Sequence, residues 1–146
     1  MKKTMLLLSI SFLVNGANGA DHRIDCPSKL EMGTLAITHP PAGWTPFVSS
    51  FVRLNSAGPM DGPPALMAVL KEDVYIKRGR KTVTKWTWGK DDGNQSYPDG
   101  KWMACNYGAE NGMILSKRID DAASECTVTY TDNKSGQPDI EIHCQW

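Results

Sequence analysis

The sequence predicts an all-β fold: a single-domain antiparallel sheet packed as a small sandwich or open barrel and stapled by two disulfides. The last third of the chain consists of short segments rich in β-branched and aromatic residues, separated by turn residues. The four cysteines are an even number in a chain that begins with an export signal. Without that signal about 126 residues remain, the usual size of one domain with one core.

The first 20 residues have the three parts of a signal peptide. Two lysines form a basic start, residues 5–14 are mostly apolar, and small residues lead to a cleavage site near Gly19 or Ala20. We therefore expect residues 21–146 to reach the periplasm as a single β domain. No later segment approaches the roughly 20 apolar residues of a membrane-spanning helix, so we expect no membrane attachment after cleavage.

The first half of this domain predicts short strands around a proline-rich loop. Residues 24–32 predict a first strand, which Pro27 keeps at a sheet edge. Residues 39–46 contain three prolines, which remove amide donors and fix φ, so this segment is a loop. Trp44 in the loop is most simply a plug over the edge of the core, and stacking on a ligand is the alternative.

The middle of the chain continues this pattern. Residues 47–54 have strand-like composition, and residues 55–64 predict a turn-rich connection. Residues 65–71 are a continuous apolar run that fits a buried strand or a short helix, and we interpret them as a strand. Within residues 75–83, Gly79 lies between basic pairs, which is typical of a solvated hairpin tip.

Four aromatic residues predict the main aromatic cluster of the core. Trp86 and Trp88 are two positions apart and point to the same side of a strand. We expect Trp102 and Tyr107 to join them. Residues 89–100 between these segments form the longest polar loop, where binding groups tend to lie.

The last third predicts four consecutive antiparallel strands, arranged as a simple meander. The strands cover residues 102–107, 113–119, 126–131 and 139–144.

Four cysteines permit three disulfide pairings. In a meander, a third strand separates Cys105 from Cys126 by about 9 to 10 Å, beyond the roughly 7 Å that a disulfide allows. Cys126 and Cys144 are equally far from Ser135 in the loop between their strands, so they can face each other. We favour Cys126 with Cys144, which leaves Cys26 with Cys105.

Composition argues against nucleic-acid binding, metal binding and catalysis. Two of the 16 basic residues lie in the signal and all 16 acidic residues follow it, so the mature chain has a net charge of −2. It therefore has no overall positive potential that would attract the phosphates of a nucleic acid. No C-x-x-C pair occurs, and the three histidines are scattered singly. No nucleophile elbow or Cys–His signature occurs either. We expect no cofactor and no enzyme activity, and the acid pairs Asp91-Asp92 and Asp120-Asp121 fit solvated turns better than glycosidase carboxylates.

Seven landmarks in order carry a family resemblance. The landmarks are Cys26-Pro27, the PPAGW of 40–44, the DGPP of 61–64, the WTWG of 86–89, W-x-x-C-x-Y at 102–107, C-x-V-x-Y at 126–130 and G-x-P-x-I-x-I-x-C at 136–144. With these landmarks the chain resembles a family of small exported four-cysteine bacterial proteins, which includes periplasmic immunity proteins against type VI secretion effectors of the L,D-transpeptidase class.

The resemblance implies a protein that binds and occludes a cognate peptidoglycan-modifying toxin. A periplasmic inhibitor of a lysozyme-type hydrolase and a non-inhibitory glycan-binding or wall-binding module are the alternatives. From protruding loops we expect Arg78, Arg80, Tyr97 and, more weakly, Trp44 to contact the partner. We expect the mature protein to be a monomer.

Overall fold

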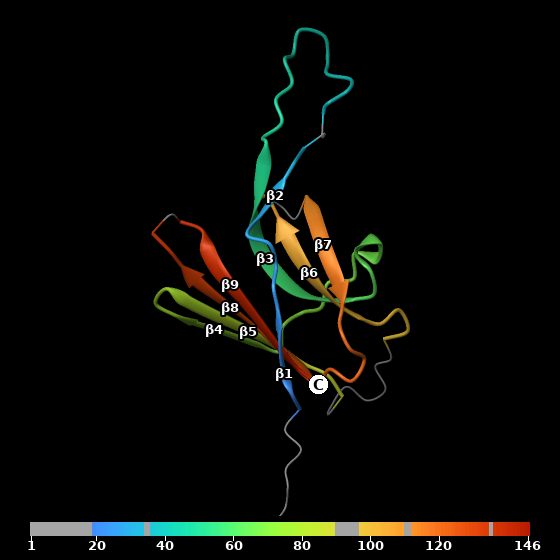
Figure 1. Ribbon diagram of the computed structural model, residues 1–146, viewed down its shortest axis with the longest axis vertical. Coiled ribbons are helices and arrows are strands. Elements are labelled where there is room, and N and C mark those ends of the chain that lie inside the picture. The colour runs from blue at the N-terminus through green and yellow to red at the C-terminus, as the bar shows by residue number, and fades with distance from the viewer. Residues whose placement is uncertain (1–18, 34–35, 90–96, 110–111, 135) are drawn as a thin grey trace, which may run out of the picture.

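The computed structural model describes residues 19–33, 36–89, 97–109, 112–134 and 136–146. Strands in these residues form two antiparallel sheets (Figure 1). The predicted signal peptide lies almost wholly outside them. The strands are β1 (Asp21–Ile24), β2 (Lys29–Glu31), β3 (Phe51–Asp61), β4 (Val74–Arg78), β5 (Lys81–Thr87), β6 (Lys101–Tyr107), β7 (Met113–Arg118), β8 (Glu125–Asp132) and β9 (Pro138–Gln145).

The two sheets pack face to face, which confirms the predicted all-β class. One sheet has five strands in the order β1-β9-β8-β5-β4, and the other has four in the order β2-β3-β6-β7. Successive side chains of a strand point to opposite faces of the sheet, which explains which residues of β8 and β9 are buried. In β8 Cys126 and Val128 point inward, and in β9 Ile142 and Cys144 do the same, all fully buried.

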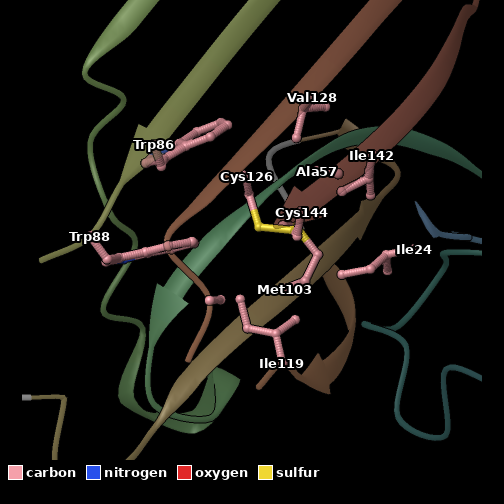
Figure 2. Packing of buried hydrophobic residues seen from close by; sticks show 11 residues of the cluster. Ile24, Ala57, Trp86, Trp88, Met103, Ile119, Cys126, Val128, Ile142 and Cys144 are labelled. Carbon is pink, nitrogen blue, oxygen red and sulfur yellow. A yellow bond between two sulfur atoms is a disulfide. The ribbon is translucent and has the colours of Figure 1, made fainter. Parts of the chain in front are cut away.

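Figure 2 shows the main core, which gathers side chains from both sheets around one disulfide. A smaller cluster contains Leu54, Cys105 and Tyr107. The predicted aromatic cluster is therefore wrong in part, because Trp86 and Trp88 lie in the main core while Tyr107 lies in the smaller one. Trp102 is only half-buried, since strand alternation turns it away from buried Met103. The main core comprises Ile24, Ala57, Trp86, Trp88, Met103, Ile119, Ala123, Cys126, Val128, Ile142 and Cys144.

The predicted first strand is two strands in two different sheets. β1 pairs with β9, whereas β2 pairs with β3. The link between them is held by Tyr107, whose hydroxyl donates to the carbonyl oxygen of Pro27 at 2.8 Å. It is also held by the amide of Leu54, which donates to the carbonyl oxygen of Ser28 at 2.9 Å.

β3 runs from Phe51 to Asp61, so the predicted turn-rich connection at 55–64 is mostly strand. A register shift between Leu54 and Ser56 bends it. Pro59 is tolerated because its carbonyl oxygen accepts from the amide of Leu70 at 3.1 Å, so its backbone polar groups face away from β6 and the missing amide removes no bond between β3 and β6.

The predicted strand at 65–71 is also wrong. A 3₁₀-helix, η1 (Pro64–Leu66), is followed by Met67 with φ of 53°, and Val69 makes only an isolated bridge to Met60. The apolar run does not form a buried strand, because Leu66, Met67 and Val69 are exposed.

The last four predicted strands all exist, but they are not a meander. β6 pairs with β7 in the smaller sheet and β8 pairs with β9 in the larger one, so the chain crosses between sheets after β7. Ile119 and Ala123 are buried in this crossing. The ammonium group of Lys101 donates to the carbonyl oxygens of Asp121 at 2.9 Å and Ala123 at 2.7 Å, which fixes the crossing to β6.

Both favoured disulfides are confirmed. Cys126 and Cys144 are registered partners with Cα atoms 4.1 Å apart, as their equal spacing from the loop predicts. Cys26 is bonded to Cys105 with Cα atoms 5.8 Å apart. The argument that excluded a disulfide between Cys105 and Cys126 assumed that both residues lie in one sheet. That argument does not apply, because the two residues lie in different sheets.

We predict that the Cys26–Cys105 cross-link stabilises the fold more than the Cys126–Cys144 cross-link. The sequence separations are 79 and 18 residues, for which loop-closure entropy gives about 4.5 and about 3 kcal/mol. Each pair is replaced by alanine, and urea unfolding of each variant with and without reductant isolates the cross-link that remains. Equal contributions from the two would show that loop length does not set the ranking.

Candidate partner-binding surface

The four residues predicted to contact a partner lie at three separate places. Trp44 lies on a projection between β2 and β3, at the top of Figure 1. Arg78 and Arg80 lie at the β4–β5 turn. Tyr97 is half-buried and packs against the main core.

The projection is an arm that we define as residues 36–48. The amide of Met32 donates to the carbonyl oxygen of Ser50 at 2.8 Å, so the arm starts where the β2–β3 pairing ends. Every residue from 36 to 47 is exposed. Among the large apolar side chains, Ile37 is 50% exposed, Trp44 74% and Phe47 86%. The prediction that Trp44 plugs the core is therefore wrong, because the arm leads away from the body (Figure 1).

A turn at the end of the arm sets the position of Trp44. The amide of Trp44 donates to the carbonyl oxygen of Pro41 at 3.1 Å. Gly43 has φ of 83° at the third position of this turn, as a type II turn requires. Three prolines at 40, 41 and 46 further restrict the backbone of the arm.

Charge is absent from the arm and gathers at its base. Residues 36–48 contain no Asp, Glu, Lys or Arg. At the base, Lys29 pairs with Glu31 at 2.6 Å, and the guanidinium of Arg53 lies 5.0 Å from the centre of the Phe51 ring. We call Lys29, Glu31 and Arg53 the charged collar. An apolar tip above a charged collar resembles the apolar centre and polar rim of a protein interface.

The second place is the tip of the β4–β5 hairpin, and it is strongly basic. Gly79, with φ of 57°, opens a two-residue turn between Arg78 and Lys81, which is the pattern of a type II′ hairpin. Arg80 donates from its guanidinium to the carbonyl oxygen of Asp132, and so is tied to the end of β8. Arg78 is exposed at the end of the edge strand β4 and is directed toward solvent.

Tyr97 belongs to a packing contact as well as to the surface. The Lys101 ammonium lies 5.6 Å from the centre of the Tyr97 ring and 5.2 Å from that of Trp88. Desolvation lowers the pKa of Lys101 from its ordinary value. The sequence pattern did not indicate a role for Lys101. Only the tertiary structure brings the two rings and the β7–β8 connection close to its ammonium group.

A groove of about 320 Å³ is lined by residues of both sheets. Its lining includes Trp86, Leu70, Tyr75 and Tyr130. The Tyr130 hydroxyl donates to the carbonyl oxygen of Ala57 at 2.6 Å and accepts from the amide of Ala57 at 3.3 Å, so it bridges β8 and β3. Burial raises the pKa of Tyr130.

Structural contacts account for the acid pair at 120–121. Asp120 accepts from the amide of Ala122 at 2.8 Å, and Asp121 pairs with Arg118 at 2.9 Å. In the described part of the chain no cluster of three or more metal-binding side chains occurs, and no helix has the length and apolarity to cross a bilayer. The other acid pair, at 91–92, lies outside the described residues.

Comparison with known proteins gives one family match. Residues 49–145 match the family described as Type VI secretion system Tli immunity protein. The chain belongs to this family. The match spans β3 to β9 and therefore most of both sheets, and it begins at Ser49, where the arm rejoins the body. No curated protein and no solved structure matches the chain.

Membership of the Tli immunity family establishes the class of function. The protein is a type VI secretion immunity protein, and its expected partner is a cognate effector protein. The family match contains three of the four cysteines, at 105, 126 and 144. Cys26, β1, β2 and the arm lie before it.

We predict that Tyr130→Phe lowers the free energy of unfolding by about 1 to 2 kcal/mol, because two hydrogen bonds between the sheets are lost. The stability advantage of the wild type over this variant is complete below about pH 10 and declines above it, because the unfolded phenol releases its proton before the folded one. Urea unfolding of both proteins between pH 7 and 11 measures this. A difference that is constant across this range would show that Tyr130 does not titrate in this way.

Proposed function

We propose that this protein protects its producer by binding a cognate type VI effector in the periplasm and covering the active-site cleft of that effector. The observation that carries the proposal is the match of residues 49–145 to the Tli immunity family. We further propose that the effector modifies peptidoglycan and is of the L,D-transpeptidase class, on the family resemblance given above. Inhibition then needs no catalytic group of the immunity protein, which acts as an inhibitor and not as an enzyme.

The periplasm is the proposed site of action for two reasons. The first 20 residues have the pattern of a signal peptide. Both disulfides are formed, and disulfides persist in oxidising compartments. A protein cross-linked in this way keeps one shape outside the cytosol, which reduces the entropy that binding would otherwise cost.

The size and surface of the domain support inhibition in which the immunity protein covers the active-site cleft of the effector. An interface of standard size needs roughly 800 Å² on each partner, which a domain of this size offers. Arg78 and Arg80 give the hairpin tip a positive charge that attracts an acidic surface. Trp44 offers an exposed aromatic side chain, whereas half-buried Tyr97 contributes only its outer edge.

The wall-binding alternative loses two of its tryptophan rings, although Trp44 is 74% exposed. Trp86 and Trp88 are each 6% exposed, so a glycan strand has no access to them. Inhibition of a lysozyme-type hydrolase differs from the proposed function only in the enzyme that is stopped, and the same experiment separates the two.

We predict that periplasmic expression of the effector encoded next to this gene kills cells that lack the protein and spares cells that produce it. Removal of residues 1–20 should abolish protection, because the immunity protein then stays in the cytosol with its cysteines reduced. Growth after induction measures both. Protection by the cytosolic form, or survival without any immunity protein, would contradict the proposal.

We predict that Arg78→Glu slows association with the effector by about tenfold at low salt and that added salt removes the difference. Surface charge acts mainly on the association rate, which stopped-flow or surface-plasmon measurements report. Lys117→Glu on β7, in the other sheet, is the matched control and should leave the rate unchanged. An equal effect of both variants would assign the change to net charge alone.

A further inference from the structure

We propose that the arm, residues 36–48, is the effector-recognition element and that it inserts Trp44 and Phe47 into a nonpolar, uncharged cleft of the cognate effector. This inference rests on the proposed function and names the surface that performs it. The arm projects from the end of the β2–β3 pair (Figure 1). A convex element of this kind requires a concave partner.

The exposure of the arm requires an explanation. Large apolar side chains scattered singly over a surface need none, but the arm concentrates Ile37, Trp44 and Phe47, with exposed fractions of 50%, 74% and 86%, on 11 consecutive residues. Neither core cluster of the described residues includes Ile37, Trp44 or Phe47, so these side chains are not part of the packed interior. Trp and Phe each bury about 150 to 250 Å² when they are covered, so these two rings supply a large share of a standard interface.

The charge distribution identifies the chemistry of the partner. A cleft that carries unpaired charge would lose hydration against the uncharged arm without receiving a counter-ion. A nonpolar cleft has no charge whose hydration would be lost when the arm covers it. The charged collar of Lys29, Glu31 and Arg53 at the base then meets the polar rim around the cleft, while the aromatic anchors fill its centre.

The backbone of the arm is suited to binding without a large loss of entropy. Three prolines fix φ, and the turn closed by the Trp44 amide and the Pro41 carbonyl holds the tip in one conformation. A restricted loop loses less conformational freedom on binding than a flexible loop of the same length.

The family match separates the arm from the shared framework. The match begins at Ser49, immediately after the arm, and continues through the last strand. Strands β3 to β9 are therefore the part that this chain shares with the Tli family, whereas β1 and β2 lie before the match. The arm lies outside that part, where a difference between cognate effectors can be accommodated without change to the core.

The experiment measures binding of an inactivated form of the effector encoded next to this gene, together with protection in cells. Trp44→Ala combined with Phe47→Ala is expected to weaken binding at least about 100-fold and to abolish protection, because both anchors are removed. The matched control is Leu66→Ala combined with Leu115→Ala, which removes exposed apolar side chains from η1 and β7 and should leave affinity within about threefold. Both variants should retain two disulfides and the wild-type urea midpoint, since none of the four residues lies in the core.

A second pair of variants tests the chemistry of the cleft. Ala42→Glu and Ala42→Lys place either sign of charge at the exposed turn of the arm. Both should weaken binding by about tenfold or more, since a nonpolar cleft accepts neither charge. Tighter binding by one of the two would show a charged cleft and overturn this part of the inference.

The outcomes separate this inference from the proposed function. If the wild type binds and protects while the Trp44/Phe47 variant does so equally well, the arm is not the recognition element and the proposed function stands. If the wild type neither binds nor protects, the proposed function fails and the inference fails with it. If light scattering shows a wild-type dimer that the variant converts to a monomer with effector binding intact, the arm serves a second copy of the chain, and the inference is overturned.

Discussion

The structure depends on the packing of two sheets against the buried Cys126–Cys144 disulfide. The bond joins registered residues of β8 and β9, and both sulfurs lie at the centre of the main core (Figure 2). Ile24 reaches this centre from β1, Trp86 from β5 and Met103 from β6. Side chains from the ends of the chain thus share one core with those of its middle, so neither sheet could bury its apolar face without the other.

Two connections between the sheets are fixed by specific bonds. The link between β1 and β2 carries Cys26, which is bonded to Cys105 of β6. The link between β7 and β8 is held by the Lys101 ammonium, which donates to the carbonyl oxygens of Asp121 and Ala123. These contacts hold the two sheets together at both connections, and neither of them involves the arm between β2 and β3.

This organisation divides the molecule into a framework and a projection. The framework corresponds to the family match together with β1, β2 and their disulfide. The arm makes no contribution to either core cluster, and its apolar side chains face solvent. An immunity protein benefits from such a division, because the rigid sheets limit the entropy lost on binding while the exposed element can differ without loss of stability.

The sequence by itself determined the class of the fold, the strands of the last third, the β4–β5 hairpin and the Cys126–Cys144 pair. The alternation of side chains along a strand and a glycine at a turn are local features, so they can be recognised from a short stretch of sequence. Only the tertiary structure decided that β7 and β8 belong to different sheets, that β3 continues through Pro59, and that Trp44 is exposed. These outcomes depend on contacts between residues far apart in the chain, such as Lys101 with Ala123 and Pro59 with Leu70, which local periodicity does not encode.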